Sequence, residues 1–332
     1  MRSQIGQACR ASVAFLALAM RREWARRGLL LLLFLSLRAP ADAMSRTTRW
    51  GPRWLARLVA RYLTALATRI GVTHDVAWPA REIAPDRRYV LVWHPHGAYT
   101  FSALFIGALL SLEGRPIRWS TGIATILFRV PVLREVLALL DAREVTHAVL
   151  DRLLGAGRSV GLQPGGIPEQ LRTSHEQEQA IFAPNVAFCR LALRHGVPLL
   201  PCYLFNENQL YATTPARQRL SRQIFAATGF PLILVTGRWG LPWIVPRPTN
   251  ISVRFGRPVE VGPPQQAPSA AAVEELFARY VAELRRLFDE HKALLPPDVA
   301  ARGLAVSRRT ARSTSQPDLT ANPGALELVS KM

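Results

Sequence analysis

From about residue 85, short apolar runs alternate with segments of helical periodicity, and this alternation restricts the fold more than any other feature of the chain. Apolar runs bounded by turn residues predict strands, and apolar residues spaced three and four apart predict helices. The pattern predicts strands at 89–93, 159–162, 198–205, 230–235 and 250–255, and helices near 132–140, 145–154, 185–195 and from 270 onward. Such an order is typical of an α/β domain.

The predicted domain occupies residues 85–295. Its last helix starts after Ser269 and carries one apolar face that begins with Val273 and Leu276. Beyond the two prolines at 296–297 the chain turns polar and basic, which predicts a disordered tail over 296–332. Because 49% of the 332 residues are hydrophobic, the chain has enough apolar side chains for a sizeable core.

Two apolar runs of ten residues, 11–20 and 28–37, precede the domain and are separated by a short charged segment. Neither run reaches the roughly twenty residues that a membrane-spanning helix needs. A re-entrant hairpin, a signal peptide and a signal anchor all fit these runs. We favour a hydrophobic, membrane-embedded hairpin over residues 1–45.

Residues 46–84 are predicted to hold an amphipathic helix and a linker. Between 54 and 70 the apolar side chains fall on one helical face, while Arg53, Arg57 and Arg61 recur at every fourth position on another. A helix packed on an ordinary soluble domain has the same pattern. The apolar runs upstream favour a helix that lies at the membrane interface.

The chain carries a formal charge of +19, and every basic residue except Lys292 and Lys331 is an arginine. Guanidinium groups suit phosphate and carboxylate recognition, so an anionic partner is implied: nucleic acid, an anionic membrane surface or a phosphorylated cofactor. Since no nucleic-acid-binding module is recognisable, we do not expect nucleic acid. Cys9, Cys189 and Cys202 lack both zinc-ligand spacing and a disulfide framework, which predicts a reducing compartment and no metal.

The predicted strand at 89–93 is followed at once by His94, Pro95, His96 and Gly97. Strand ends of this kind often present chemistry. Imidazole takes up a proton near neutral pH, the proline stiffens the turn, and the glycine lets backbone or substrate come close. We therefore predict a general base at the mouth of a pocket, with a pair of structural histidines as the alternative.

A second strand end carries Gly165 and Gly166, followed by Glu169. Adjacent glycines expose backbone amides, which can stabilise an oxyanion. Glu169 is the nearest carboxylate that could orient an imidazole. A plain turn with a solvated glutamate is the simpler interpretation.

Two later clusters also follow apolar runs. The polar segment that starts with Phe-Asn-Glu-Asn at 205–208 comes directly after a predicted strand, where loops build sites. Arg238 stands among glycines and tryptophans at 236–243 and could hold a phosphate or lie at the bilayer interface.

Taken together, these segments resemble the type-2 diacylglycerol acyltransferase family, which includes monoacylglycerol and wax-alcohol acyltransferases. The resemblance covers about residues 85–295, keeps the order of the motifs, and rests on the segments 94–97, 129–135, 164–169, 191–196 and 203–211. It implies a glycerolipid-acyltransferase-like mixed sheet flanked by helices, preceded by the hydrophobic membrane hairpin.

The resemblance further implies an integral membrane enzyme of the endoplasmic reticulum and the lipid droplet surface. Such an enzyme transfers a fatty acyl group from the co-substrate acyl-CoA to the hydroxyl of diacylglycerol, without a metal or other cofactor. By position, His96 is implied as the general base with His94 beside it. Glu169 is the candidate acid partner, because more distant relatives have aspartate where this chain has Phe101.

The other implied site residues fall into two groups. Those expected to stabilise the oxyanion or bind acyl-CoA are Gly97, Gly165, Gly166, Arg190, Arg194 and Arg238. Those expected in the acceptor pocket are Phe205, Asn206, Glu207 and Asn208.

The chain departs from the family at 185–188, which reads Asn-Val-Ala-Phe where the family usually has Arg-Lys-Gly-Phe. Two cations that could meet CoA phosphates are therefore missing. The alternatives are an acyltransferase that acts on monoacylglycerol, a long-chain alcohol or a sterol, and a weakly active membrane lipid-binding homologue. Homo-oligomerisation, acceptor identity and acyl-chain preference stay open.

Overall fold

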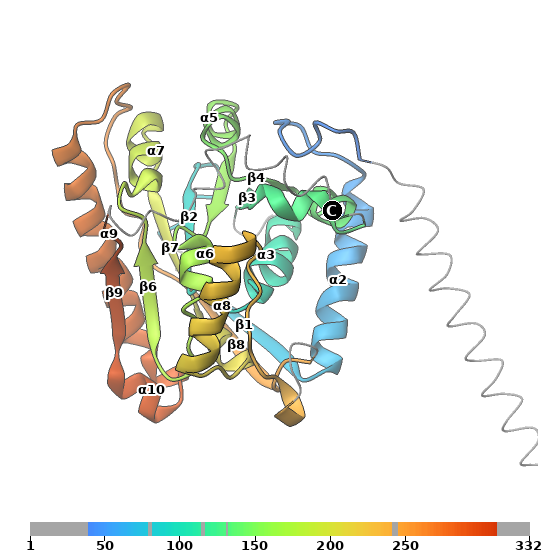
Figure 1. Cartoon of the computed structure of the whole chain (residues 1–332). Coiled ribbons are helices and arrows are strands. Elements are labelled where there is room, and N and C mark those ends of the chain that lie inside the picture. Colours follow the sequence, from blue (N-terminus) through green and yellow to red (C-terminus); the bar gives the residue numbers. More distant parts are fainter. Residues whose placement is uncertain (1–38, 79–81, 114–116, 131, 241–244, 311–332) are drawn as a thin grey trace, which may run out of the picture.

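The computed structural model describes residues 39–78, 82–113, 117–130, 132–240 and 245–310. Within these ranges, seven strands form one sheet in the order β1-β8-β7-β2-β5-β3-β4 (Figure 1). Neighbouring strands are parallel except for β7 and β8, which run antiparallel. The predicted α/β fold with a mixed sheet flanked by helices is confirmed. The predicted hairpin lies outside the described residues as far as residue 38.

The bounds of the elements are as follows. The strands of the large sheet are β1 (Val72–Ala77), β2 (Val90–His94), β3 (Trp119–Ile123), β4 (Ala142–Glu144), β5 (Ser159–Leu162), β7 (Leu199–Phe205) and β8 (Thr249–Phe255), and a separate pair is formed by β6 (Glu178–Phe182) and β9 (Leu304–Arg308). The α-helices are α2 (Arg53–Arg69), α3 (Phe101–Glu113), α4 (Leu133–Leu139), α5 (His147–Gly155), α6 (Gly166–Gln170), α7 (Ala187–His195), α8 (Pro215–Thr228), α9 (Ala270–His291) and α10 (Pro297–Arg302). Short 3-10 helices are η1 (Thr125–Arg129), η2 (Glu207–Leu210), η3 (Arg238–Gly240) and η4 (Lys292–Leu294).

Local signals in the sequence set several helix ends. Thr146, Thr214 and Ser269 each accept a hydrogen bond from a backbone N–H in the first turn of α5, α8 and α9. Such caps satisfy donors that the helix itself leaves unpaired. Helix α7 ends at Gly196, whose φ of 59° is in the left-handed region that glycine adopts without strain. The predicted helices at 145–154, 185–195 and after Ser269 are confirmed.

The strand β2 separates two halves of the core because its side chains alternate between the faces of the sheet. Val90 and Val92 pack with α5, α7 and α9, whereas Leu91 and Trp93 pack toward α3 and α8. Figure 1 shows the sheet between these two layers, with α2 on the outside of α3. The alternation places the side chain of His94 on the α9 side, where β2 ends.

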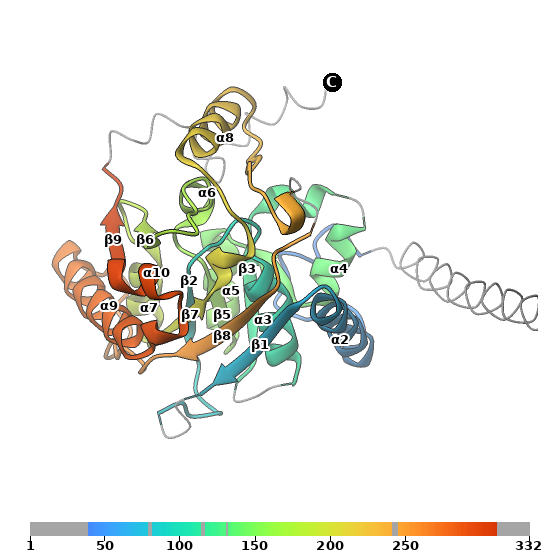
Figure 2. The same cartoon turned by 90° about the horizontal axis from the view of Figure 1, so that it is seen from below.

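The carboxyl-terminal part of the described chain differs from the sequence prediction. The tail was predicted to be disordered from residue 296, but residues 297–308 form α10 and β9, and β9 pairs in parallel with β6. Figures 1 and 2 show this pair beside α9. The apolar segment 230–235 forms no strand and makes one bridge nearby, between Ala212 and Thr236. None of the described helices combines the length and the apolar character required to cross a bilayer.

Candidate active site

Three predicted segments meet at the carboxyl ends of the central strands. The histidine turn at 94–97 follows β2, the glycine loop at 163–166 follows β5, and the segment 206–208 follows β7. Because β2 lies between β5 and β7 and runs parallel to both, their loops leave the sheet at the same edge. The side-chain amide of Gln163 donates to the carbonyl oxygen of Pro95 at 3.2 Å, so the first two loops are in direct contact.

Glu169 joins these loops from the first turn of α6, and it is only 2% exposed. Its Oε1 accepts the backbone N–H of His96 at 2.8 Å, and its Oε2 accepts the backbone N–H of Ile181 at 3.2 Å. A Cβ on Gly165 would overlap the Glu169 carboxylate, so only glycine fits there. The carboxylate thus fixes the backbone of the histidine turn, whereas the sequence interpretation assigned it to the ring of His96.

The two histidines have different surroundings. His94 is fully buried, and among the described residues neither ring nitrogen has a hydrogen-bond partner. The ring packs edge-on against Phe182 with centroids 5.2 Å apart, and its Nδ1 lies 3.9 Å from Oε1 of Glu169. His94 is therefore enclosed by aromatic side chains, while His96, beyond Pro95, is only partly buried.

The ring of His96 makes its hydrogen bond with Thr100, a residue that the sequence analysis missed. Nδ1 of His96 lies 3.0 Å from Oγ1 of Thr100, which is also 3.4 Å from the carbonyl oxygen of His96. Desolvation lowers the pKa of His96 below its usual value, although the carboxylate of Glu169 acts in the opposite direction. A neutral imidazole is therefore present at neutral pH and can accept a proton.

A second buried carboxylate, Glu178, lies behind the turn and was also missed by the sequence analysis. Its Oε2 accepts hydrogen bonds from the hydroxyl of Tyr203 at 2.7 Å and from the amide of Asn208 at 3.0 Å. Burial raises the pKa of Glu178 to about 7, the bonds from Tyr203 and Asn208 oppose this, and the carboxylates of Glu169 and Glu207 add to it. Glu178 thus lies beside Tyr203, which is the partner of His94 in the pairing of β2 with β7, and is near enough to Glu169 and Glu207 for their charges to act on it.

The four residues predicted for the acceptor pocket do not all lie at the histidine turn. Glu207 is buried against the turn, and a Cβ on Gly97 would lie 2.8 Å from its Cγ. Asn208 is buried as well and takes part in the Glu178 network. Phe205 packs in the core against Tyr203 and Phe288, and the amide of Asn206 donates to the carbonyls of Asn250 and Leu294, away from the histidines.

The glycines predicted to stabilise an oxyanion also differ from one another. The backbone N–H of Gly166 already donates to the carbonyl of Gln163 at 3.1 Å. The backbone N–H of Gly165 has no acceptor among the described residues. Of these two amides, the one at Gly165 is therefore the unpaired donor.

The three arginines predicted to bind acyl-CoA are not gathered in one place. Arg190 donates to the carbonyl of Pro268, and Arg194 pairs with Asp151 on α5 at 2.8 Å. Arg194 lies in the last turn of α7, close to where the chain enters the amino end of β7, which is the edge opposite the histidines. Arg238 stacks on the exposed Trp239 ring at 4.7 Å.

The segment that precedes Arg238 borders the histidine turn. The hydroxyl of Tyr99 donates to the carbonyl of Ile233 at 3.1 Å, and the rings of Tyr99 and Tyr211 meet edge to face at 5.3 Å. These aromatic side chains give the turn an apolar flank. Among the described residues, no group of three or more His, Cys, Asp or Glu side chains is placed to hold a metal ion.

Comparisons with known proteins identify the family of the chain. The family model "Diacylglycerol acyltransferase" matches residues 71–300. The chain is 32% identical over 240 residues to human 2-acylglycerol O-acyltransferase 3, an alignment that covers 64% of this chain and 66% of the relative. It is 29% identical over 234 residues to diacylglycerol O-acyltransferase 2 of Xenopus tropicalis, covering 64% of this chain and 63% of that one. The chain thus spans slightly less than two thirds of the length of these relatives.

A third relative acts on another class of acceptor by name. Human acyl-CoA wax alcohol acyltransferase 2 is 28% identical over 263 residues, covering 71% of this chain and 73% of the relative. Among solved structures, 1-acyl-sn-glycerophosphate acyltransferase PlsC from Thermotoga maritima superimposes with a TM-score of 0.43 and 16% identity, over 78% of this chain and 89% of that one. Since the family model matches well over half of the chain, the protein belongs to the diacylglycerol acyltransferase family.

Proposed function

We propose that this protein is an acyl-CoA-dependent O-acyltransferase that transfers a fatty acyl group to the hydroxyl of diacylglycerol and so makes triacylglycerol, with His96 as the general base. The observation that carries the proposal is the geometry of His96. Its backbone is fixed by Glu169 and its Nδ1 by Thr100. Relatives with acyltransferase names support the reaction class.

The contact with Thr100 supports one tautomer of His96. The hydroxyl has a single proton, and because it donates this proton to the carbonyl of His96 it meets Nδ1 as an acceptor. The proton then sits on Nδ1, and Nε2 carries the free lone pair. No described side chain bonds to Nε2, which is the nitrogen that we assign as the base.

The reaction balances without a covalent enzyme intermediate. Nε2 of His96 removes the proton of the acceptor hydroxyl as its oxygen attacks the thioester carbonyl carbon. The backbone N–H of Gly165 supports the oxyanion that forms. The C–S bond then breaks, and the CoA thiolate takes the proton from the imidazolium. Ester and CoA are the products.

The described cysteines do not offer an alternative nucleophile. Cys189 and Cys202 are both fully buried. Burial raises the pKa of both thiols far above the usual range. Because the thiolate is the reactive form, neither cysteine is poised to form an acyl-enzyme.

A membrane surface is the proposed working place, either the endoplasmic reticulum membrane or the lipid droplet. The outer side of α2 carries an exposed apolar stripe, which we define as Trp54, Leu58, Tyr62 and Leu66; these side chains are 66%, 51%, 50% and 44% exposed. The adjoining side packs on α3 and α4 through residues such as Leu55 and Val59. A surface helix of a soluble domain needs only one apolar side, which packs on the core. The exposed stripe is an additional apolar side, and it fits a helix that lies at a bilayer interface.

The relatives suggest other acceptors as alternatives to diacylglycerol. Monoacylglycerol, a long-chain alcohol or a sterol could replace diacylglycerol, since relatives of similar identity carry 2-acylglycerol and wax-alcohol names. A weakly active membrane lipid-binding homologue is the other alternative. The departure at 185–188 motivates it: Asn185 is exposed where a cation is expected, and Val186 is buried.

The test is an assay of the full chain in detergent and in liposomes, with labelled acyl-CoA and a panel of the four acceptor classes. We expect labelled triacylglycerol, and a His96→Ala variant that loses roughly 10²–10⁴ in kcat while keeping its unfolding temperature. Full activity of that variant would exclude the assigned base. Absence of product with every acceptor would favour the lipid-binding alternative.

A further inference from the structure

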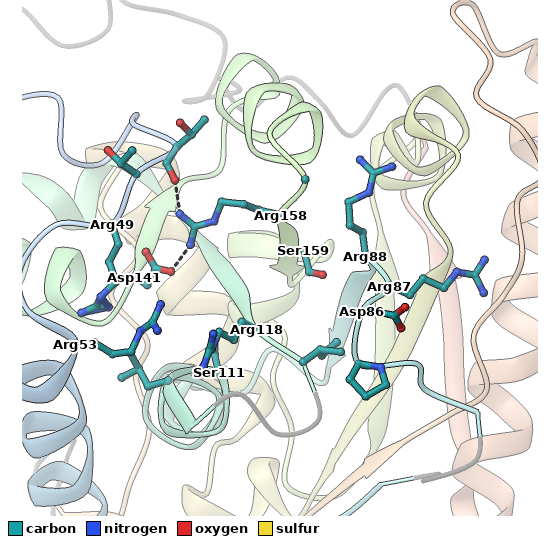
Figure 3. A pocket seen from close by; sticks show the side chains of 16 residues that line it. Arg49, Arg53, Asp86, Arg87, Arg88, Ser111, Arg118, Asp141, Arg158 and Ser159 are labelled. Carbon is teal, nitrogen blue, oxygen red and sulfur yellow. Dashed lines mark hydrogen bonds and ion pairs between the residues drawn. The ribbon is translucent and has the colours of Figure 1, made fainter.

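A separate pocket of about 670 Å³ opens at the edge of the sheet opposite the histidine turn (Figure 3). Residues one or two positions before parallel strands line it: Arg88 before β2, Arg118 before β3, Asp141 before β4 and Arg158 before β5. A strand of five residues is about 15 Å long, so a ligand in this pocket is well separated from His96. The acyl transfer proposed above leaves this pocket without a role.

The lining of the pocket is strongly basic. Six arginines and two aspartates supply its charged groups: Arg49, Arg53, Arg87, Arg88, Arg118, Arg158, Asp86 and Asp141. Helix α2 adds to the positive potential because it begins at Arg53, has no acidic residue in its first turn and receives no side-chain cap from Pro52.

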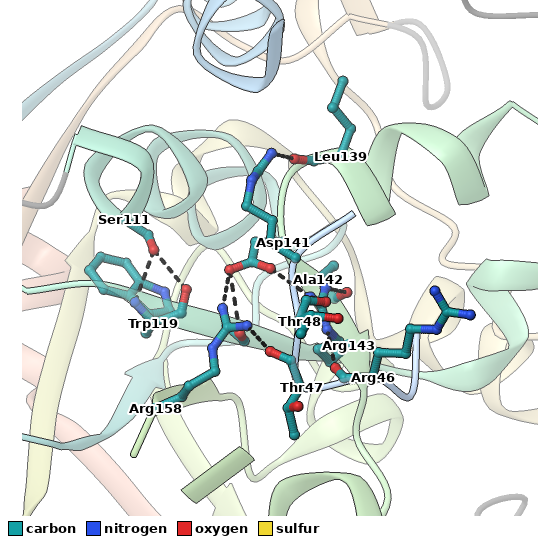
Figure 4. A network of polar contacts seen from close by, with 12 residues as sticks. Arg46, Thr47, Thr48, Ser111, Trp119, Leu139, Asp141, Ala142, Arg143 and Arg158 are labelled. Atoms are coloured by element: carbon teal, nitrogen blue, oxygen red, sulfur yellow. Dashed lines mark hydrogen bonds and ion pairs between the residues drawn. The ribbon is translucent and has the colours of Figure 1, made fainter. Parts of the chain in front are cut away.

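One of the two aspartates is already neutralised by arginines. Figure 4 shows Asp141 between Arg143 and Arg158. The guanidinium of Arg143 is fully buried, lies 2.8 Å from Asp141 and also donates to the carbonyls of Arg46 and Thr48. Asp141 is therefore already paired with Arg143 and Arg158, which hold the 46–48 segment. Its negative charge does not neutralise the other arginines of the pocket.

Two of the six arginines likewise have partners outside the pocket. Arg87 forms two contacts with the carboxylate of Glu260, and Arg88 donates to the carbonyl of Leu154 at 2.7 Å. In Figure 3 these two side chains stand apart from the cluster around Arg49 and Arg53. Because these two arginines already have acceptors, they are less available to bind a ligand than the arginines without partners.

Three arginines remain with unused donors. Arg53 and Arg118 have no hydrogen bond or ion pair with any described residue. Arg49 donates through Nη2 to the carbonyl of Leu139, but its Nε and Nη1 are buried and have no partner among the described residues. Burial lowers the pKa of Arg49, Asp141 opposes this, and the neighbouring positive charge of Arg53 adds to it. An anion would satisfy these donors and remove the repulsion.

We propose that this pocket is a phosphomonoester-binding site, in which Arg49, Arg53 and Arg118 bind the phosphate dianion. Three guanidinium groups supply the paired donors that phosphate oxygens accept, and two negative charges match the excess of positive charge better than a carboxylate does. The volume leaves room for a group attached to the phosphate.

Two sources of the phosphate are consistent with this chemistry. One is a soluble phosphorylated metabolite. The other is the headgroup of a lipid with a terminal phosphate, because Arg53 directly precedes Trp54, the first residue of the exposed stripe on α2. In both cases the ligand binds apart from the reacting groups and acts on the domain as an anchor or an effector.

The test measures binding to the purified full chain at physiological salt, where weak surface attraction is screened. The soluble probe is glycerol 3-phosphate, followed by the shift in unfolding temperature. The lipid probe is a phosphatidylcholine vesicle that contains phosphatidic acid, compared with one that contains phosphatidylglycerol, whose phosphate is a diester. The variants are Arg53→Gln and Arg118→Gln, and the control is Arg285→Gln, which removes an equally exposed arginine without a described partner on α9.

We expect at least one probe to bind the wild type and Arg285→Gln equally, and each pocket variant to bind it about tenfold more weakly. Binding of glycerol 3-phosphate identifies a soluble ligand. A preference for phosphatidic acid over phosphatidylglycerol that is lost in Arg118→Gln identifies the lipid headgroup. Equal losses in all three variants, or no response to either probe, would overturn the proposal. A His96→Ala variant should bind normally, which separates this result from the acyltransferase assay.

Discussion

Oγ1 of Thr100 lies 3.0 Å from Nδ1 of His96, and Thr100 reaches this position with a φ of 54°, in the left-handed region that β-branched residues rarely adopt. Unfavourable backbone geometry of this kind is kept where the surrounding structure holds it. Here it aligns a hydroxyl with the proposed base.

Replacing Thr100 by valine should therefore impair the base while keeping the shape of the side chain. We expect kcat to fall about tenfold, less than for loss of the base itself, with little change in KM, because Thr100 positions His96 and does not touch substrate. The pH at which kcat reaches half its maximum should also move. Steady-state kinetics from pH 5 to pH 8 measure both effects, and a Thr100→Ser variant should restore activity. Equal activity of the valine and wild-type proteins would contradict the assigned tautomer.

Gly97 offers a test of how tightly the turn packs. A Gly97→Ala variant must adopt a φ of 67° and place its Cβ 2.8 Å from Cγ of Glu207, so we expect a loss of about 2–4 kcal/mol in unfolding free energy. Gly262 is the matched control, because it has a φ of 77° and open space around its Cβ position. Gly262→Ala should lose only about 1 kcal/mol. Equal losses in denaturant titrations would mean that contact with Glu207 is unimportant.

The sequence was sufficient to predict the histidine turn, but it did not reveal the residues that hold the turn in place. A continuous apolar run that ends in two histidines is visible without a structure, as are the glycines at 165–166. Glu178 is not, because it stands between Gln177 and Gln179 in a polar segment and becomes buried only when β7 brings Tyr203 against it. Thr100 could have been found from its spacing of four residues from His96, but its hydroxyl contact depends on an unusual backbone conformation.

The fold was also predicted unevenly. Strands β2, β5, β7 and β8 consist largely of buried residues, so their apolar runs identify them. Strand β1 lies at an edge of the sheet and only Val72 is buried, so its sequence carries little hydrophobic signal. On α2 the apolar residues lie on one broad face, as predicted, but in the structure only part of that face is buried and the rest is exposed. Sequence periodicity identifies apolar positions, and only the tertiary structure shows which ones find a partner.

Glu178 should make the stability of the protein depend on pH. Its pKa is raised to about 7 in the folded state from an ordinary value near 4.5, so the folded state binds more protons between these values. Its contribution to stability is therefore present at pH 4 and lost as the pH rises through 7. A Glu178→Gln variant, which cannot ionise, should gain about 3 kcal/mol relative to wild type between pH 4.5 and pH 8. Denaturant titrations across this range measure the difference, and a difference that does not vary with pH would exclude the raised pKa.

The ion pair between Asp141 and Arg143 should contribute far more to the free energy of unfolding than the ion pairs at the surface. Asp141→Asn leaves the fully buried guanidinium of Arg143 without its counter-charge, which costs roughly 3–5 kcal/mol when a buried pair is broken. The control is Asp151→Asn, which breaks the partly exposed pairs with Arg194 and His195 and should cost less than about 1 kcal/mol. Comparable unfolding free energies for the two variants would show that Arg143 is held by its carbonyl acceptors alone.

The exposed stripe on α2 predicts which side of the helix meets a bilayer. A fluorophore that reports polarity, attached to a Leu58→Cys variant, should shift its emission to the blue when phosphatidylcholine vesicles are added, because Leu58 lies in the stripe. The matched control is Thr64→Cys, a half-exposed position on the same helix about 120° around its axis from Leu58, where the emission should stay unchanged. Both variants need a Cys9→Ser background, whereas Cys189 and Cys202 are buried and will not react. Both labels are on the same helix, so membrane binding through any other part of the chain would change their emission alike. Equal shifts at both positions would therefore refute an interfacial role for this side of α2.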